Sequence, residues 1–492
     1  MDFVVTNGIV HRGQYVEIDY PEGVMIALVT DVIKTNRYFE RADSVKEFEN
    51  SGTQIFEQFP TAEWEYLVAK TRPLGVFASE KVKRATFPPS PGTRARVASK
   101  ENLEKFLRFD KENGLFLGRI DYHDVEVMLG LNSLLRKHLS ILAMSGSGKT
   151  HCVSCLIEEL LDRKREQGRI AVIALDPHGE YTSFALQPRD SSKKDYSAKT
   201  KIVRAREMKI GVPKLSVSII SSIIPGLSAA QKRELDRIIV KLNREMRQGL
   251  GPYGLEELKQ AIAQETEMHS GTKDALVAWV YSLQDLGLFS KVDSPGIFDV
   301  VKPGHLTVVD LSDIIDLRKK QIIVSYFAQR LFAERRKKTI APFLMILEES
   351  HLWIPEKAIA EQSVSKGILR TIAREGRKFG ASLCLVSQRP IQLDTTTLSQ
   401  CNTSIILRIT NPYDLDHIAK SAEALDRRSL DLISSLRVGE ALMIGEAVNN
   451  PVFFTVRQRK SMESQHEVSL EKAARDFEEG KEKEEKETEE FL

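Results

Sequence analysis

The fold of this 492-residue chain is decided by one stretch of sequence, Ala143-Met144-Ser145-Gly146-Ser147-Gly148-Lys149-Thr150. It matches the pattern A/G-x-x-x-x-G-K-S/T, in which glycines let successive backbone N–H groups converge on a phosphate. The apolar segment 139–142 before it predicts a strand, and the segment 151–163 after it has a helical pattern. A strand, a glycine loop and a helix N-terminus in this order predict a phosphate-binding loop within an α/β domain.

Each position from 145 to 151 has an expected part in nucleotide binding. Lys149 is expected to reach the β- and γ-phosphates of ATP, and Thr150 to ligate Mg²⁺. An ordinary glycine turn is the alternative interpretation, and the flanking strand and helix argue against it. Ala143 stands where many such loops begin with glycine. The predicted nucleotide-binding residues are Ser145, Gly146, Ser147, Gly148, Lys149, Thr150 and His151.

A second apolar strand ends in two adjacent carboxylates. Residues 344–347 are Leu-Met-Ile-Leu, and Glu348 and Glu349 follow directly. ATPases with a phosphate loop need one acid to support the metal and one to polarise the attacking water. Glu348 is therefore predicted to support Mg²⁺, and Glu349 to act as the general base. The alternative is a strand that ends in a solvated acidic turn.

Polar residues also follow two other predicted strands. Gln388 ends the strand 381–387 and is a candidate sensor of the γ-phosphate. Asp176 follows the strand 170–175 and begins the turn Asp176-Pro177-His178-Gly179-Glu180-Tyr181. Loops at carboxyl strand ends line the ligand crevice of an open parallel sheet, so Asp176 is a candidate contact to Mg²⁺. For both residues, a simple turn is the alternative.

Residues 369–380 place four cations in a helix-like stretch. On an isolated subunit such a stretch is a solvated basic face. In a ring ATPase an arginine of this kind can complete the neighbouring subunit's site and neutralise charge in the transition state. Arg374 is the first candidate and Arg377 the second.

Composition excludes several classes of protein. With 42% hydrophobic and 28% charged residues, the chain is globular rather than disordered. It has no apolar run near the roughly 18 residues that cross a bilayer. The N-terminus lacks a secretory pattern, and four cysteines fit a reducing compartment, so we expect a cytoplasmic protein without a membrane anchor. The net charge is +2, but residues 471–492 hold ten acidic and five basic side chains.

The patterns divide the chain into three parts. Residues 1–100 have short β-like segments, with a helical patch near 42–50, and predict a small β-barrel. Residues 101–455 alternate apolar strands with helices, which predicts a RecA-like α/β ATPase core with a mainly parallel sheet. A helical insertion is expected at about 225–290, and a charged tail at 456–492. The predicted core strands are 138–143, 170–175, 305–311, 343–347, 381–387 and 403–409.

Several motifs occur together in a fixed order. They are AMSGSGKT, DPHGEY, ILEESHLWIPE, IAREGRKFG, SQRP and CNTSIILRITNPYD, after YPEG and NRYFERA. In this the chain resembles the archaeal HerA ATPases of the HerA–FtsK superfamily, from about residue 10 to residue 456. The resemblance implies functional roles for Lys149, Thr150, Glu349, Gln388 and an arginine finger, Arg374.

The resemblance also implies an activity and partners. HerA proteins are homohexameric rings that translocate double-stranded DNA with ATP. They act in double-strand break end resection with a NurA-type nuclease and the double-strand-break repair nuclease complex. Their N-terminal domain resembles the barrel of ATP synthase subunits and docks partners.

A translocating ring needs basic loops that hold the DNA backbone without reading its sequence. The candidate loops are residues 189–201 and 357–366, and ordinary solvated loops are the alternative. The candidate DNA-binding residues are Lys193, Lys194, Lys199 and Lys357.

The sequence therefore predicts an ATP-driven, Mg²⁺-dependent, hexameric double-stranded DNA translocase or helicase. Two other functions remain open. A conjugation- or secretion-type ATPase would need a membrane anchor or docking region. A phosphate-loop kinase for a small molecule would leave the helical insertion and the N-terminal barrel without a role.

Overall fold

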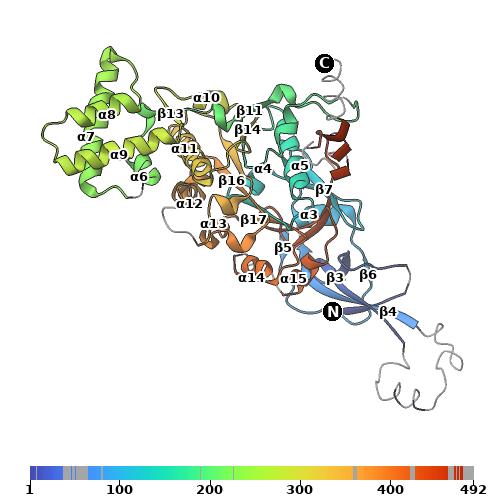
Figure 1. Ribbon diagram of the computed structural model, residues 1–492. Helices are drawn as coiled ribbons and strands as arrows, with labels where there is room; N and C mark the ends of the chain where they lie inside the picture. The colour runs from blue at the N-terminus through green and yellow to red at the C-terminus, as the bar shows by residue number, and fades with distance from the viewer. Residues whose placement is uncertain are drawn as a thin grey trace. The chain divides into compact units, whose positions relative to one another are not determined.

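The computed structural model (Figure 1) describes residues 1–6, 8–36, 46, 50, 65–78, 81–188, 190–224, 226–357, 363–421, 427–463, 470–471, 474–475 and 477–479. The chain forms two compact units. Unit 1 contains Met1–Arg136, Ala143–Gly148 and Asn402–Arg457, and unit 2 contains Lys137–Leu142, Lys149–Cys401 and Gln458–Leu492. The chain thus passes between the units several times, while the boundaries predicted at residues 100 and 455 stay predictions.

Unit 2 is built on a parallel run of six strands in the order β11-β14-β10-β15-β16-β9. Every residue of β9, β10, β15 and β16 is buried, which explains why these segments are almost continuously apolar. The strands are β9 (Leu139–Leu142), β10 (Ala171–Asp176), β11 (Thr200–Arg204), β14 (Leu306–Asp310), β15 (Phe343–Leu347) and β16 (Ala381–Ser387).

The structure confirms five core strands predicted in this unit to within a residue or two at each end. It adds β11, which begins inside the loop predicted at 189–201. Lys201 therefore lies on a strand, and Lys199 directly precedes it. The pattern Thr-Lys-Ile-Val-Arg has too few apolar residues to indicate a buried strand.

Helices flank the strands of unit 2. The longest is α11 (Leu317–Arg336); α5 (Lys149–Asp162) follows the glycine loop, and α12 (Lys366–Glu375) contacts α11 and β16. Short helices α10 (Ile297–Val300) and α13 (Thr395–Leu398) complete this set.

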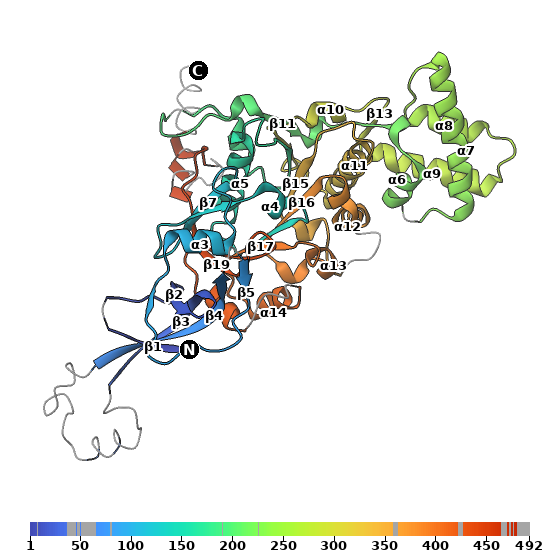
Figure 2. The ribbon, with the colours of Figure 1, turned by 180° about the vertical axis from the view of Figure 1, so that it is seen from behind.

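The helical insertion gathers apart from the parallel strands within unit 2 (Figure 2). Ser228 caps one of its helices with a reciprocal capping box to Gln231. Helices occupy most of the described part of the stretch for which the sequence predicts the insertion. Its helices are α6 (Val217–Ile223), α7 (Ala229–Glu245), α8 (Leu255–Gln264) and α9 (Ser270–Asp285).

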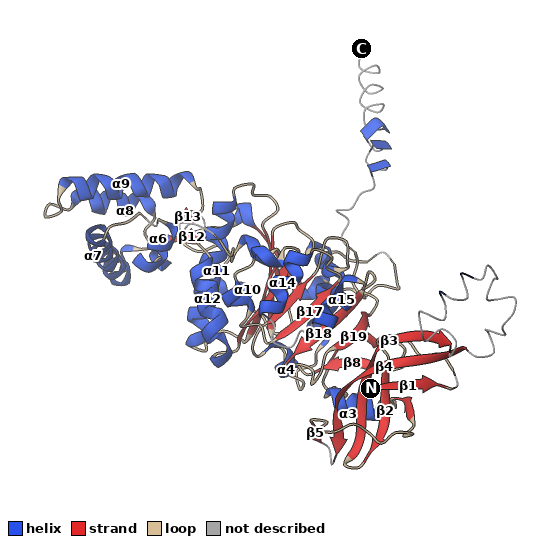
Figure 3. Ribbon diagram, turned by 90° about the horizontal axis from the view of Figure 1, so that it is seen from below, coloured by secondary structure: helices blue, strands red, loops and turns tan. Residues whose placement is uncertain are grey.

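Unit 1 has antiparallel pairing. Its N-terminal strands form a six-stranded sheet in the order β1-β4-β3-β2-β6, with β5 paired to β4 (Figure 3). Closure of this sheet into the predicted barrel is not confirmed, and the helical patch at 42–50 lies almost wholly outside the described residues. The strands are β1 (Asp2–Val5), β2 (Tyr15–Tyr20), β3 (Gly23–Asn36), β4 (Glu65–Ala78), β5 (Lys81–Lys83) and β6 (Ala95–Val97).

A second antiparallel set in unit 1 runs β17-β18-β19-β7-β8. The prediction of mainly parallel pairing holds for unit 2 and not for these strands. The strands are β7 (Leu115–Ile120), β8 (Glu126–Leu129), β17 (Thr403–Leu407), β18 (Glu440–Gly445) and β19 (Val452–Val456). The helices of unit 1 are α3 (Lys100–Leu107), α4 (Leu131–Leu135), α14 (Pro412–Ser421) and α15 (Arg427–Ser434).

In the part of the chain that the structure describes, no helix combines the length and the apolar character that a membrane crossing requires.

Candidate active site

The glycine loop connects β9 to α5 along the chain. Gly146 and Gly148 adopt positive φ angles of 75° and 96°, which explains why glycine stands at these two positions. The Ser147 hydroxyl donates a hydrogen bond to the Met144 carbonyl at 2.6 Å, and the Gly439 N–H donates to the Ser147 carbonyl at 3.2 Å. The loop is therefore held by its own backbone and by a neighbouring segment of unit 1.

Lys149 begins α5, and its side chain lies between two carboxylates. The amine donates to Glu348 and, at 2.8 Å, to Oε1 of Glu349. The side chains of Lys149, Glu348 and Glu349 are only 5%, 0% and 6% exposed. Burial favours the neutral amine, but the two carboxylates outweigh it and raise the pKa of Lys149. The structure thus brings together the phosphate-loop lysine and the acidic pair that the sequence predicted 199 and 200 residues downstream.

Glu348 is fixed on several sides. Its Oε1 accepts from Lys149, its Oε2 accepts from the Tyr181 hydroxyl, and its backbone carbonyl accepts from Nε1 of Trp353 at 2.7 Å. Burial disfavours the charged carboxylate, and the nearby Lys149 opposes this effect. The net result raises the pKa of Glu348 to about 7.

Glu349 has an unusual backbone conformation and one open oxygen. Its φ of 49° lies in the left-handed region, which non-glycine residues adopt in only a few per cent of cases. Its Oε2 is buried and has no hydrogen bond with the described residues; Nδ1 of His351 lies 3.2 Å away. Burial lowers the pKa of His351, so this ring is neutral at neutral pH. An available carboxylate oxygen is what a general base requires.

The turn after β10 links two parts of the site. Asp176 accepts hydrogen bonds from the backbone N–H groups of His178, Gly179 and Tyr181, so its carboxylate closes the turn. Burial raises its pKa. Glu180 accepts from the Thr150 hydroxyl at 2.5 Å, and Tyr181 binds Glu348. Of the two acids in this turn, Glu180 lies next to the predicted metal ligand Thr150.

The remaining predicted catalytic residues lie on two elements of unit 2. Gln388 directly follows β16 and is half-buried. Arg374 and Arg377 are exposed near the end of α12, and neither forms a hydrogen bond or ion pair with the residues that the structure describes. Arg370 instead binds Asp394 through two nitrogens. Burial of Asp394 favours its neutral acid, but the hydrogen bonds outweigh burial and lower its pKa to about 2.

The predicted DNA-binding lysines differ in their surroundings. Lys194 pairs with Asp162 at 2.7 Å. Lys193 and Lys199 donate to the backbone carbonyls of Arg459, at 3.3 Å, and Leu161, at 2.5 Å. Lys357 is exposed.

The residues present fit ATP and Mg²⁺. A Cβ added at Gly146 would meet no atom within 4 Å, which leaves room beside the loop backbone for a phosphate. The orphaned Oε2 of Glu349 leaves an acceptor for water. The carboxylates of Glu180, Glu348 and Glu349 and the Thr150 hydroxyl are hard oxygen ligands of the kind Mg²⁺ prefers.

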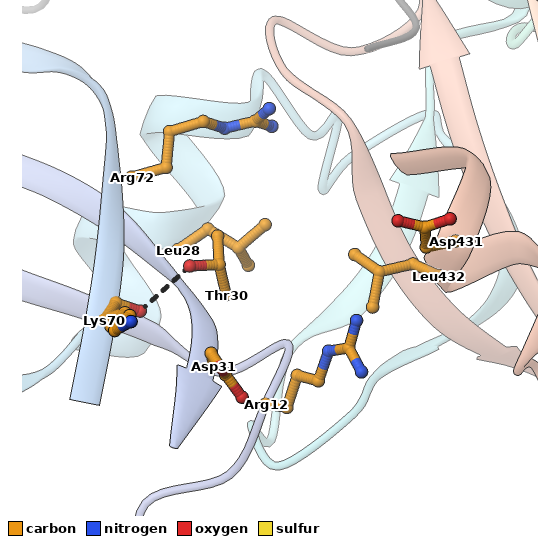
Figure 4. Close-up of a pocket in the computed structure, with 8 residues that line it drawn as sticks. All are labelled: Arg12, Leu28, Thr30, Asp31, Lys70, Arg72, Asp431 and Leu432. Carbon is orange, nitrogen blue, oxygen red and sulfur yellow. Dashed lines mark hydrogen bonds between the residues drawn. The ribbon is translucent and has the colours of Figure 1, made fainter. Parts of the chain in front are cut away.

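A further cavity lies in unit 1, with a volume of about 290 Å³ (Figure 4). In it the Thr30 hydroxyl donates to the Lys70 carbonyl at 3.1 Å. Cations and carboxylates both line this cavity, so its charge is largely balanced internally. The lining residues are Arg12, Leu28, Thr30, Asp31, Lys70, Arg72, Asp431 and Leu432.

Known proteins resemble this arrangement. Residues 115–331 match the family model of the central domain of the helicase HerA. In these residues the chain resembles the HerA helicases. This match confirms the predicted resemblance and the predicted class of enzyme, a helicase. The chain is 29% identical over 466 residues to the DNA double-strand break repair helicase HerA of Saccharolobus solfataricus, covering 90% of this chain and 87% of that one.

One further curated relative and one solved structure are also similar to this chain. A probable helicase of Methanocaldococcus jannaschii is 28% identical over 476 residues, with 90% of this chain and 86% of that one covered. The solved structure of VirB4 of Thermoanaerobacter pseudethanolicus matches with a TM-score of 0.55 at 15% identity, over 73% of this chain and 99% of that chain. The likeness to VirB4 shows the α/β phosphate-loop ATPase fold and nothing about substrate.

Sequence reasoning assigned no role to Tyr181, Trp353 or His351. Tyr181 follows Glu180 in a quoted motif, and the other two follow Glu349 within five residues. A buried aromatic or histidine near a motif usually belongs to the core, so only the three-dimensional contacts reveal that these side chains hold the acidic pair.

Proposed function

We propose that this HerA-like chain is an ATP-hydrolysing motor that moves along or separates double-stranded DNA in the repair of double-strand breaks. One observation carries the proposal: the buried amine of Lys149 lies between Glu348 and Glu349, and Glu349 keeps one carboxylate oxygen open. This is the constellation that phosphoryl transfer to water needs, with a cation for the phosphates and a base for the attacking water.

Each side chain has a distinct part in this proposal. The backbone of residues 145–148 and the amine of Lys149 would hold the phosphates. Thr150 and Glu348 would hold Mg²⁺. Asp176 and Glu180 would support the metal site from the turn after β10. Bound Mg²⁺ neutralises charge on the phosphate oxygens. Glu349 takes a proton from water through Oε2. Gln388 senses the terminal phosphate, and His151 lies in the first turn of α5 beside the nucleotide.

The release of Lys149 is the first consequence of nucleotide binding in this scheme. In the structure its amine donates hydrogen bonds to both carboxylates. Phosphates compete for the same amine, so Glu348 and Glu349 lose a partner as Lys149 turns towards the nucleotide. Glu348 would then be free to hold Mg²⁺, and Glu349 to take a proton from water.

We further propose that six copies form a ring in which Arg374, with Arg377 as second candidate, reaches the neighbouring subunit's site. Their exposure and their lack of a partner within the described chain support this role. The ring encloses duplex DNA, with Lys193, Lys194, Lys199 and Lys357 as candidate phosphate contacts. A NurA-type nuclease docks on the N-terminal domain, and the double-strand-break repair nuclease complex acts in the same process.

A conjugation- or secretion-type ATPase is the second candidate, because the fold shared with VirB4 does not by itself separate it from a repair helicase. The names of two curated relatives that match over most of the chain favour the repair helicase.

The test compares wild type with Glu349→Gln, which keeps the shape of the side chain and removes its basicity. ATP hydrolysis is measured with and without linear duplex DNA, on protein whose solution mass is determined in the same buffer. We expect DNA-stimulated turnover by a species near six times 55.6 kDa, and a variant that binds ATP without hydrolysing it. Retained hydrolysis in Glu349→Gln would remove Glu349 from the base role, and turnover indifferent to DNA in a monomer would contradict the motor.

A further inference from the structure

A basic pocket lies at the edge of the parallel strands opposite the acidic pair. It has a volume of about 140 Å³ and is formed where β11 and β14 begin. Thr200 pairs with Leu306 in register, so the residues that precede the two strands meet at this edge. The lining residues are Ala198, Lys199, Thr200, Lys201, Asp299, Lys302, His305, Leu306 and Thr307.

The cations of this pocket lack internal neutralisation. Lys199 donates to the Leu161 carbonyl at 2.5 Å, and Lys201 donates to the Asp299 carbonyl at 3.4 Å. Lys302 is exposed and makes no side-chain hydrogen bond within the described residues. None of the three forms an ion pair with a described carboxylate, although the exposed Asp299 lies at the rim. A carbonyl contact orients an ammonium group but leaves its charge available to an outside anion.

The rest of the amino edge of these strands is also rich in positively charged residues. Each of the six strands in the run β11-β14-β10-β15-β16-β9 follows a basic residue within five positions. Lys137, Arg169, Lys199, Lys302, Lys338 and Lys378 precede β9, β10, β11, β14, β15 and β16. Glu348 and Glu349 follow the other end of β15. With a rise of about 3.3 Å per residue, a five-residue strand separates the two edges by roughly 15 Å. The pocket is therefore distinct from the nucleotide site.

We propose that this pocket binds a phosphate group of the DNA backbone, with Lys201 and Lys302 as the principal contacts and Lys199 and His305 beside them. The proposal rests on the proposed function, since it names where the duplex would touch unit 2. The observations favour a phosphodiester because the pocket offers several cations that form no ion pair with a described carboxylate. Lys302 and His305 lie outside both loops that the sequence indicated.

The experiment measures the affinity of the full-length protein for two labelled duplexes of unrelated sequence over a range of salt concentrations. The variants are Lys302→Ala and, independently, Lys201→Ala. The matched control is Lys214→Ala, which removes an exposed lysine of unit 2 outside the pocket. We expect each pocket variant to weaken binding of both duplexes alike, by about threefold to tenfold. The salt slope should fall by about 0.9 for each DNA phosphate that the variant no longer neutralises.

Three results would overturn the inference. If wild type binds duplex and both pocket variants bind as Lys214→Ala does, the pocket does not touch DNA, while the proposed function stands. If wild type binds no duplex but hydrolyses ATP, the DNA part of the proposed function falls together with the pocket. If inorganic phosphate raises the melting temperature of wild type but not of Lys302→Ala, with unchanged DNA affinity, the pocket binds free phosphate instead.

Discussion

Two groups of lysines lie at opposite edges of the parallel strands of unit 2, and they are neutralised in different ways. Lys149 is buried between Glu348 and Glu349 at the carboxyl edge. Lys201 and Lys302 line a pocket at the amino edge and have no carboxylate partner in the described chain. A lysine that is neutralised internally is part of the folded core until a stronger anion displaces its partners. A lysine without such a partner contributes little to folding and is available to an external anion.

The largest expected difference is in stability. Lys149→Ala leaves two buried carboxylates without their shared cation, so we expect a loss of about 3–5 kcal/mol in the free energy of unfolding. Lys302→Ala removes a surface charge and should change the free energy of unfolding by less than about 0.5 kcal/mol. Denaturant unfolding of the two variants beside wild type measures both values. Equal stability of both variants would show that the amine of Lys149 is not neutralised as the structure indicates.

A pH prediction compares two histidines near the amino edge. His138 is buried; Nδ1 accepts from the Leu383 N–H and Nε2 donates to the Ala373 carbonyl, both at 2.9 Å. Burial lowers its pKa to about 4. At His138 the unfolded chain therefore binds a proton more readily than the folded chain does. The neutral, buried ring contributes about 3 kcal/mol to the free energy of unfolding above pH 6.5, and this contribution is lost as the pH falls towards 4.

The variants His138→Gln and His305→Gln separate this effect from general acid unfolding. Stability measured between pH 7 and pH 4 should fall less steeply in His138→Gln than in wild type. His305 is only half-buried in the basic pocket, so its variant should follow the wild-type curve. If both variants reduce the pH dependence of stability equally, burial of His138 is not its cause.

At the carboxyl edge, Tyr181 is expected to position Glu348 without touching substrate. Tyr181→Phe removes the hydrogen bond to Oε2 of Glu348. Loss of a hydrogen-bond partner behind a metal ligand typically lowers metal affinity or activity by about 10- to 100-fold, so we expect kcat to fall by about that factor. The Mg²⁺ concentration at half-maximal rate should rise as well. Tyr196→Phe is the matched control, because Tyr196 is also buried and its hydroxyl also binds a carboxylate, that of Asp162 at 3.1 Å. If the two variants have the same kcat and Mg²⁺ requirement, Tyr181 has no special role.

The smallest expected effect concerns Lys194. Its charge is already paired with Asp162 at 2.7 Å, so Lys194→Ala should weaken duplex binding by less than about twofold. Lys302→Ala, measured in the same titration, should weaken it more. The reverse order would show that local pairing does not decide which lysines bind DNA.

The sequence predicted the chemistry of the carboxyl edge better than that of the amino edge. Two short motifs that directly follow apolar strands contain the site residues Lys149, Thr150, Glu348 and Glu349. The strands themselves are recognisable because a buried strand is apolar along its whole length. Five strands of unit 2 could be predicted for the same reason.

The basic pocket gave no such signal. Lys199 and Lys302 are about 100 residues apart, and only the register of β11 and β14 brings them together. Tyr181 was missed because a buried tyrosine looks like core until its hydroxyl partner is known. The short antiparallel strands β7 and β8 were missed because their burial alternates and their runs are brief.

The central claim is that ATP turnover at the acidic pair drives movement along duplex DNA. A triplex-displacement assay tests it most directly, since a short third strand bound to a long duplex is released only when a motor reaches it. We expect release that requires ATP and Mg²⁺, is lost in Glu349→Gln and is slowed in Lys302→Ala. DNA-stimulated ATP hydrolysis by wild type with no displacement of the third strand, with or without a partner nuclease, would contradict it.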